Sequence, residues 1–452
     1  MNTIYRRIDE WKCRDRDIAL IFKNGENITY SQLKKEIDIQ IQLIKDFEKD
    51  NKINKQVIAL PMSRTLSTVA KLFAIIKLNK VFVPLASDIE IQKYSTIGNQ
   101  FHSSLFWDEE GKLHQVNGDA GKYEFPEKTL FIGFTSGTTG QQKGFVRDHE
   151  SWVETFQAFE NQDFPFRAKH VACLSPLNYS LGLYVLCQSL YLGQSFLMDN
   201  DSFKDILTLN LDKAEMYGVP SILRINFLKS PNISQQNFRL FLSGEPVSQD
   251  LRDDFYLRFP KAELVDFYGT SEASFIAMNR KKKPEINESG IIFPNVIVDI
   301  ENTKDGIGEI FIKSPMSFMG YYNKGIFKEA KQLIFTGDLG FVKNNSIYNV
   351  GRIDSRINRG GEKIFPKYLE ALLIEHPAIK DILIVGQADL ILGQKVKAYI
   401  IFSKDNRLSI DQINKYLKQK AKRKSVIDSI SEVKEFSINP SGKRSLKIEQ
   451  VD

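Results

Sequence analysis

The sequence contains few cysteines and histidines, and their spacing argues against the common disulfide and metal frameworks. Only three cysteines occur in 452 residues, Cys13, Cys173 and Cys187, and none of them belongs to a CxxC pair. The five histidines form no HExxH pattern. A disulfide-stabilised scaffold and a zinc site are therefore disfavoured. The composition predicts a reducing, cytoplasmic setting.

Long apolar runs and a strong excess of one charge are also missing. The amino-terminal stretch MNTIYRRIDEWKCRDRD lacks the apolar segment of a secretory signal. The most apolar run, SLGLYVLCQSLYLG, is too short to span a bilayer and predicts a buried core helix. The net charge is +6, from 62 Lys and Arg against 56 Asp and Glu. This small excess indicates no nucleic-acid partner and at most peripheral contact with a membrane.

Apolar runs of strand length alternate with helical patterns through most of the chain. QVIAL and KVFVPL enclose TVAKLFAIIKLN, whose apolar residues recur at helical spacing. Strand, helix and strand at these lengths predict βαβ units and a mainly parallel sheet. HVACLSP, AEMYGVP, FRLFLSG and ELVDFYG each read as a short strand that ends in Pro or Gly. Ligands of open α/β sheets bind at the carboxyl ends of such strands.

Beyond residue 290 the pattern changes to short strands joined by turn signals, with the two asparagines of VKNNSIY as a hairpin tip. A compact α/β tail then follows Arg352, with a helix opened by Pro366 and a basic amphipathic helix near the end. We therefore predict an α/β protein with a large multi-layer amino-terminal domain, residues 1–353, that contains parallel-rich sheets and a β subdomain. Residues 354–452 are predicted to form a small α+β domain.

One stretch, FTSGTTGQQKG at residues 134–144, combines three glycines, four hydroxyl side chains and one lysine. It is neither a GxxxxGK[ST] loop nor a GxSxG elbow. Glycines allow backbone N–H groups to converge on an anion, and the hydroxyls and the lysine add further donors and charge, so the stretch predicts a phosphate-binding loop. A flexible linker is disfavoured, because an apolar strand precedes the loop and an amphipathic helix follows it.

TSGTTGQQKG resembles the phosphate-binding signature of the adenylate-forming superfamily, which comprises acyl- and aryl-CoA synthetases, peptide-synthetase adenylation domains and firefly luciferases. YGTSE, GEIFIKSPMSFMGYYN, TGD, GRIDSRINRGGEKIFPKYLE and PSGK follow in the order of the family's other signatures. The chain looks most like a short bacterial acyl-CoA synthetase of the fatty-acid–CoA ligase type. The resemblance implies that an acid reacts with ATP to give acyl-AMP and pyrophosphate, and that a thiol then displaces AMP.

The resemblance also implies a nucleotide site. Tyr268 and the loop SGEP would line the adenine, while Asp338 and Arg352 would bind the ribose. The residues implied to bind nucleotide are Thr135, Ser136, Gly137, Thr138, Thr139, Gly140, Lys143, Gly244, Glu245, Pro246, Tyr268, Gly269, Asp338 and Arg352.

Three residues carry the chemistry that the resemblance implies. Glu272 would hold Mg²⁺, which favours oxygen ligands, and Thr270 would contact the α-phosphate. Lys443, in PSGK, would bridge the substrate carboxylate and the α-phosphate. Asp354 matches the hinge about which the small, mobile carboxy-terminal domain rotates between the two steps. After rotation, the segment around Gly360 and Gly361 would line the thiol tunnel, although Lys363 departs mildly from the family pattern.

The region SPLNYSLGL departs from the family at the acyl pocket. Tyr179 stands where the family carries a histidine, which leaves open how the pocket opens and how well CoA is used. The stretch has no aspartate to pair a substrate amine, so an amino acid is disfavoured. Nearby Leu183, Tyr184, Leu186 and Phe275 favour an apolar acyl or aryl acid. CoA is the expected acceptor; an acyl carrier protein, or a slow acyl-adenylate-binding role, remains an alternative.

Overall fold

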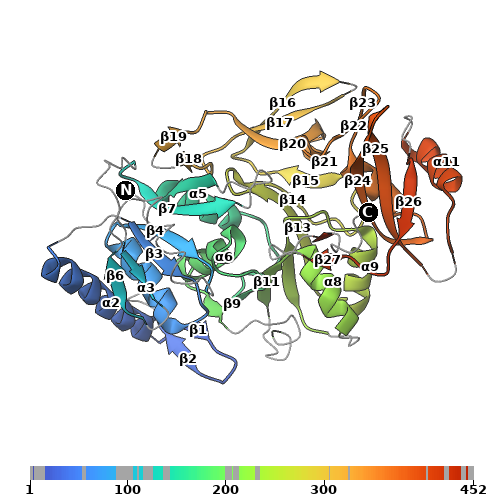
Figure 1. Ribbon diagram of the computed structural model, residues 1–452. Helices are drawn as coiled ribbons and strands as arrows, with labels where there is room; N and C mark the ends of the chain where they lie inside the picture. Colours follow the sequence, from blue (N-terminus) through green and yellow to red (C-terminus); the bar gives the residue numbers. More distant parts are fainter. Residues whose placement is uncertain are drawn as a thin grey trace.

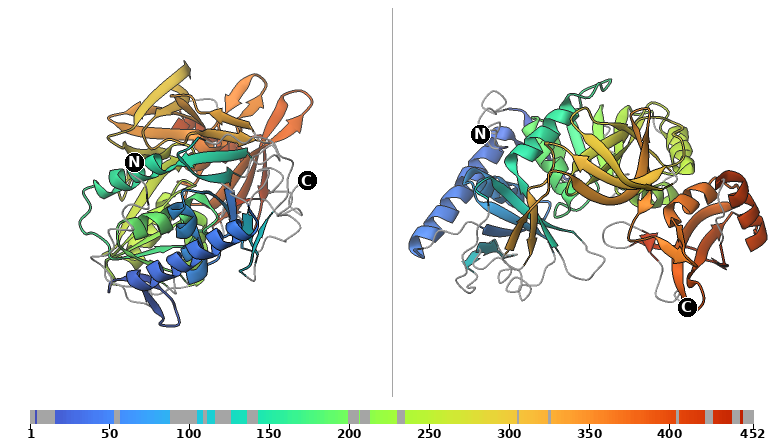
Figure 2. Two further views of the ribbon diagram at one scale, coloured as in Figure 1. Left: turned by 90° about the vertical axis from the view of Figure 1, so that its left-hand side faces the viewer. Right: turned by 90° about the horizontal axis from the view of Figure 1, so that it is seen from above.

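The computed structural model describes most of the chain, and its two large sheets enclose a core of helices (Figure 1). A smaller sheet forms a carboxy-terminal unit, which lies at the opposite end of the molecule from α2 (Figure 2). Among the described residues, no helix is long and apolar enough to cross a membrane. The residues described are 4, 16–52, 57–87, 105–108, 111–115, 126–135, 143–198, 206, 213–229, 235–304, 306–323, 326–403, 406–421, 427–438 and 444–445.

An eight-stranded sheet occupies the amino-terminal side. Its spatial order is β19 (Ile326–Glu329), β18 (Gly320–Asn323), β8 (Lys143–Asp148), β7 (Thr129–Thr135), β4 (Val81–Leu85), β3 (Val57–Pro61), β5 (Leu105–Trp107) and β6 (Leu113–Gln115). Strands β3, β4 and β7 run parallel, and α3 (Leu66–Lys77) connects β3 to β4. The predicted βαβ unit is therefore confirmed.

A thirteen-stranded sheet carries most of the remaining large domain. Its spatial order is β16 (Ile297–Lys304), β17 (Ile307–Lys313), β20 (Ile334–Lys343), β21 (Ser346–Arg352), β15 (Glu288–Ile292), β14 (Ser274–Asn279), β13 (Glu263–Thr270), β12 (Phe238–Leu242), β11 (Ala214–Gly218), β9 (His170–Cys173), β10 (Ser195–Leu197), β1 (Ile18–Ile21) and β2 (Asn27–Thr29). Strands β9 to β13 run parallel, as expected.

The strands expected as a β subdomain extend this same sheet as antiparallel neighbours. Strand β15 pairs with β14 on one side and β21 on the other, which joins the two parts. The predicted hairpin tip is confirmed: Asn344 and Asn345 connect β20 to β21 with φ values of 52° and 60°. Asparagine tolerates this left-handed conformation better than most residues, which explains the pair.

Helix α6 (Ser180–Tyr191) is the predicted buried core helix, and ten of its residues are buried. It lies in the centre of the molecule (Figure 1) and shares one apolar core with both large sheets and α5 (His149–Glu160). Gly182 is required there, since an added Cβ would lie 2.1 Å from the carbonyl oxygen of Pro176. Besides α3, the other helices among the described residues of the large domain are α2 (Tyr30–Asp50), α8 (Pro220–Lys229) and α9 (Gln249–Arg258).

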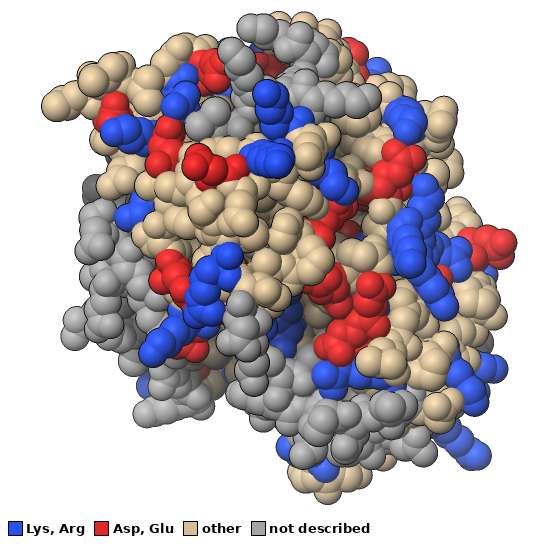
Figure 3. All heavy atoms as spheres, turned by 90° about the vertical axis from the view of Figure 1, so that its right-hand side faces the viewer, with Lys and Arg blue, Asp and Glu red and all other residues tan. Residues whose placement is uncertain are grey.

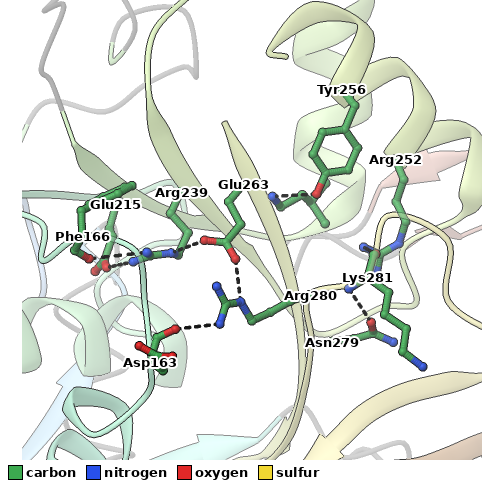
Figure 4. Close-up of polar contacts among 11 residues, drawn as sticks. Asp163, Phe166, Glu215, Arg239, Arg252, Tyr256, Glu263, Asn279, Arg280 and Lys281 are labelled. Atoms are coloured by element: carbon green, nitrogen blue, oxygen red, sulfur yellow. Dashed lines mark hydrogen bonds and ion pairs between the residues drawn. The ribbon is translucent and has the colours of Figure 1, made fainter. Parts of the chain in front are cut away.

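A buried ionic network joins neighbouring parallel strands on the side away from their carboxyl ends (Figure 4). Arg239 is fully buried; its Nη1 lies 2.7 Å from Glu215 Oε1 and its Nε 2.9 Å from Glu263 Oε2. Burial raises the pKa of Glu215 to about 7, against the opposing effect of Arg239. Arg280, in the basic run RKKK, completes the network by donating to Glu263.

The carboxy-terminal unit has its own core of residues between Ile357 and Ile427. Pro366 occupies the first turn of α10, as predicted, and α10 contacts β21. The boundary at 353/354 stays a prediction, whereas the α/β fold class is confirmed. The elements are β22 (Ile357–Arg359), β23 (Glu362–Ile364), α10 (Pro366–Leu373), β24 (Ile379–Asp389), β25 (Gly393–Phe402), α11 (Ile410–Ala421), β26 (Ser429–Glu432), β27 (Ser437–Ile438) and β28 (Arg444–Ser445).

Candidate active site

The predicted motif YGTSE forms the end of β13 and the turn into β14. Gly269 is required at this point, because an added Cβ would lie 2.3 Å from the carbonyl oxygen of Ser274. Thr270 Oγ1 accepts a hydrogen bond from the amide of Ala273 at 3.0 Å, which closes the turn. The turn therefore presents Glu272 at the carboxyl end of a parallel strand, where the sequence predicted a ligand site.

Tyr268 and Asp338, separated by 70 residues in the chain, are joined by a short hydrogen bond. Tyr268 Oη donates to Asp338 Oδ2 at 2.6 Å. Asp338 is buried, and this burial raises its pKa, while Tyr268 and Arg352 oppose the rise. Burial also raises the pKa of Tyr268, so the phenol stays protonated and donates. The tyrosine expected at the adenine thus also orients the carboxylate expected at the ribose.

Arg352 approaches the same carboxylate from β21. It pairs with Asp338 in the strand register, and its Nε lies 3.9 Å from Asp338 Oδ1. Its Nη1 donates to the carbonyl of Thr336 at 3.0 Å. Gly337, between these residues, has φ +81°, and an added Cβ would lie 2.7 Å from Arg352 Nη2. The glycine of TGD therefore makes room for the arginine, which explains the motif locally.

Glu272 is held by two contacts from the segment around β18. Its Oε1 accepts a hydrogen bond from Tyr321 Oη at 3.0 Å, and its carbonyl accepts one from the amide of Phe318 at 2.7 Å. Tyr321 belongs to the family-like segment GEIFIKSPMSFMGYYN, but the sequence alone indicates no role for it. Because the tyrosine reaches Glu272 from a different sheet, only the tertiary arrangement reveals the contact.

A second residue that the sequence did not single out supports the same turn. Arg147, on β8, is buried and donates from Nη1 to the carbonyl of Met316 at 2.6 Å and from Nη2 to Ser274 Oγ. Burial lowers its pKa to about 10, while Asp148 and Glu272 oppose that shift. Ser274 has a φ of 60°, a conformation uncommon for serine. Arg147 thus ties β8, the strand that follows the predicted phosphate-binding loop, to the Glu272 turn.

The donors present fit a magnesium ion and a nucleotide. Among the described residues, no group of three or more His, Cys, Asp or Glu side chains could hold a metal. A magnesium ion bound with phosphates needs only one or two protein carboxylates, and Glu272 supplies one. The buried carboxylate of Asp338 suits a vicinal diol, since charged acceptors make the stronger hydrogen bonds.

The predicted phosphate-binding loop is described only at its two ends. Strand β7 ends at Thr135 and β8 begins at Lys143, and these two residues pair in antiparallel register. The strands therefore bring the ends of the loop together next to β18. Ser136, Gly137, Thr138, Thr139 and Gly140 lie outside the described residues, as does Lys443.

The predicted adenine loop and acyl-pocket residue lie at the ends of central elements. Gly244, Glu245 and Pro246 follow β12, and Gly244 has φ +88°. Tyr179 precedes α6 as its N-cap residue, and its amide donates to the carbonyl of Pro176 at 3.2 Å. Strand β12 neighbours β13 in parallel, so Gly244, Glu245 and Pro246 lie at the same carboxyl edge as Tyr268.

The predicted hinge and thiol-tunnel residues are exposed. Asp354 Oδ1 lies 3.4 Å from Arg352 Nε, next to the ribose-site candidates. Gly360 and Gly361 form the tip between β22 and β23, with φ values of 54° and 86°. The amide of Gly360 donates to the carbonyl of Leu392 at 2.8 Å, within the carboxy-terminal unit. The face that carries this unit mixes basic and acidic side chains (Figure 3).

Residues 99–322 match the model of the AMP-binding enzyme family, and residues 368–443 match that of the AMP-binding enzyme C-terminal domain. The chain belongs to the AMP-binding enzyme family. The predicted adenylate-forming resemblance is confirmed, as is the enzyme class, an AMP-forming acid–thiol ligase. Membership supports ATP binding.

The chain is similar to two proteins whose names give different acids as substrates. It is 31% identical over 321 residues to the long chain fatty acid-CoA ligase VraA of Staphylococcus haemolyticus, covering 70% of this chain and 68% of that protein. It is 27% identical over 380 residues to rice 4-coumarate–CoA ligase 3, covering 77% of this chain and 68% of that protein.

Solved structures with lower identity share the fold. The ATP-bound MatB of Rhodopseudomonas palustris superimposes with a TM-score of 0.78 at 18% identity, covering 98% of this chain and 97% of that chain. The anthranilate CoA ligase AuaEII, bound to anthranoyl-AMP, gives 0.79 at 18% identity, covering 98% and 95%.

Proposed function

We propose that the protein activates an apolar carboxylic acid with ATP and transfers the acyl group to the thiol of CoA. The observation that carries this proposal is the joining of Tyr268 and Asp338 beside the Glu272 turn, in a chain of the AMP-binding enzyme family. One carboxylate is suited to the ribose and the other to the metal that accompanies the phosphates.

In the first step, a carboxylate oxygen of the acid attacks the α-phosphorus of ATP. The bond to the bridging oxygen of the β-phosphate breaks, and pyrophosphate leaves with the electron pair. Two anions meet here, so catalysis depends mainly on positioning and on positive charge. Asp338 and Arg352 hold the ribose, Thr270 contacts the α-phosphate, and Lys443 bridges the two reacting groups. Magnesium, held by Glu272, would supply further positive charge at the phosphates.

In the second step, the CoA thiol loses its proton to solvent and the sulfur attacks the acyl carbon. AMP leaves and retains the oxygen that came from the acid. The exposed hairpin tip at Gly360 and Gly361 is the surface that would line the thiol path after rotation about Asp354. Tyr179, at the start of α6, would close the acyl side of the site.

An apolar acid is supported by the side chains around α6. Leu183, Tyr184, Leu186 and Phe275 are all buried. Helix α6 carries no acidic residue that could pair with a substrate amine, and an unpaired ammonium in such surroundings is unfavourable. The acids in the names of these two relatives, a long chain fatty acid and 4-coumarate, both lack an amine.

The decisive experiment is ATP–pyrophosphate exchange screened across fatty, aromatic and amino acids. We expect exchange with an apolar acid and none with amino acids; strong exchange with an amino acid alone would contradict the proposal. Adding CoA or a holo acyl carrier protein then identifies the acceptor. Thioester on the carrier protein alone would favour the alternative acceptor. Tight acyl-AMP binding without turnover would favour a slow acyl-adenylate-binding role.

A further inference from the structure

Two aromatic rings meet directly behind the site. The ring centroids of Tyr184, on α6, and Phe275, on β14, lie 5.3 Å apart. The angle between the two ring planes is 81°, so the rings meet edge to face. Their exposed fractions are 7% and 5%. The contact shows that α6 packs directly against the beginning of β14. The two rings leave no space between them for an acyl chain.

Their place in the chain puts this pair where the acyl group must go. Tyr184 lies just over one helical turn beyond Tyr179, the residue at the mouth of the acyl side. Phe275 pairs with Gly269 in the strand register and follows closely after Glu272. An acid whose carboxylate lies near Thr270, and whose chain passes Tyr179, therefore points toward the Tyr184–Phe275 pair.

Further rings fill the volume behind the pair. Trp152 and Phe156 contact Tyr184, with centroids at 5.8 Å and 5.3 Å. On the other side, Phe267 and Phe293 contact Phe275 at 4.9 Å and 5.5 Å, and Phe293 stacks nearly parallel to it. All of these side chains are buried in one core. Such interiors are close-packed, so a long chain could enter only by displacing several rings.

We infer that the Tyr184–Phe275 pair ends the acyl pocket and restricts the enzyme to compact acids, either short aliphatic or single-ring. The inference rests on the proposed function and narrows its substrate class. It separates this chain from its relative named for long-chain fatty acids. Pockets of this kind discriminate by volume, and each methylene changes the specificity constant by roughly 10- to 200-fold.

The first test measures ATP–pyrophosphate exchange on the unmodified protein with acetate, butanoate, hexanoate, benzoate, dodecanoate and hexadecanoate. We expect kcat/KM to be highest for butanoate, hexanoate or benzoate, and lower by at least about 100-fold for hexadecanoate. A higher kcat/KM for hexadecanoate than for the short acids would overturn the inference and leave the proposed function intact. Absence of exchange with every acid, in protein that binds ATP, would instead overturn the proposed function and the inference with it.

The second test enlarges the pocket. Phe275→Ala should raise kcat/KM for dodecanoate relative to butanoate by at least about 10-fold. Phe255→Ala removes an equal, fully buried ring in a separate core cluster and should leave that ratio unchanged. Phe275→Leu, a smaller truncation, should shift the ratio in the same direction and replaces the alanine variant if that variant melts early. Equal ratios in the Phe275 variants and the unmodified protein would overturn the inference.

Tyr184→Phe separates ring volume from hydroxyl chemistry. Within the described structure, the buried Tyr184 Oη has no hydrogen-bond partner, so its loss removes no hydrogen bond seen there. The variant keeps the ring and should retain the chain-length preference of the unmodified protein. A changed preference would show that the hydroxyl, and not the volume of the ring, sets the limit, and would overturn the inference.

Discussion

Removing one hydroxyl at Tyr268 should weaken nucleotide binding through Asp338. The ring remains in Tyr268→Phe, so the packing proposed against adenine is preserved. What is lost is the 2.6 Å donor to Asp338 Oδ2. A hydrogen bond to a charged group contributes about 1.5–3 kcal/mol. The loss should therefore raise the pKa of Asp338 further, because the carboxylate loses this stabilisation.

The sign of the effect follows from the direction of the existing shift. Burial already raises the pKa of Asp338, and Tyr268 opposes that rise by stabilising the carboxylate. In the proposed site, the ribose hydroxyls need the ionised carboxylate of Asp338 as their acceptor. As pH falls and Asp338 takes up a proton, the affinity for ATP should decrease. In Tyr268→Phe, this decrease should therefore begin at a higher pH. The unfolding free energy should fall at a pH where the Asp338 carboxylate is ionised, and the difference between the two proteins should disappear as pH falls through the raised pKa of Asp338 in the folded state, where the carboxyl becomes protonated in both.

The assay is the KM for ATP in pyrophosphate exchange, measured across pH, together with thermal melts. Tyr322→Phe is the matched control, because Tyr322 is a buried tyrosine on β18 whose side chain packs in a different core cluster. We expect the KM for ATP at neutral pH to rise by about 10-fold or more in Tyr268→Phe only. An unchanged KM for ATP at neutral pH, with an unchanged rise of that KM toward acid pH, would refute the role of the hydroxyl.

Four further changes test other parts of the account. Tyr321→Phe should weaken Mg²⁺ binding in the presence of a non-hydrolysable ATP analogue by about 10-fold, measured by calorimetry, because Glu272 loses its orienting donor. Arg239→Met should lower the unfolding free energy in urea by about 3–5 kcal/mol, since Glu215 is left buried and unpaired; a loss below about 1 kcal/mol would contradict this. Lys443→Ala should slow adenylation by about 10²–10³ but spare thioester formation from supplied acyl-AMP; equal losses would exclude its role. Asp354→Pro fixes the local backbone, so exchange should persist while thioester formation falls, and unchanged rates with a normal melt would show that the pivot lies elsewhere.

The sequence predicted those features that depend on short stretches of chain. The strands that end at Gly218, Leu242 and Thr270 were predicted from their apolar runs and terminal turn residues, and α6 was predicted from its hydrophobicity. Gly269 illustrates why the motif was informative: the turn tolerates no side chain there. Short patterns constrain local backbone geometry, and the family signatures add the expected chemistry.

Contacts between distant segments could not be predicted in the same way. Tyr321 reaches Glu272 from the other sheet, and Arg147 reaches Ser274 across 127 residues of chain. Neither residue type is unusual in its local stretch, so only the packing of the two sheets gives these side chains their roles. The same holds for β15, whose pairing with β14 and β21 makes one sheet from strands expected as a separate β subdomain. The roles of the loop from Ser136 to Gly140 and of Lys443 stay predictions.

The most direct test of the central claim follows the oxygen of the acid. A single turnover is run with ATP, CoA and an acid labelled with ¹⁸O in its carboxylate, and the nucleotide and phosphate products are analysed by mass spectrometry. If the carboxylate attacks the α-phosphorus, one labelled oxygen should appear in AMP and none in pyrophosphate. Unlabelled AMP, or label in inorganic phosphate with ADP as the nucleotide product, would contradict an acyl-AMP intermediate and with it the function proposed for this site.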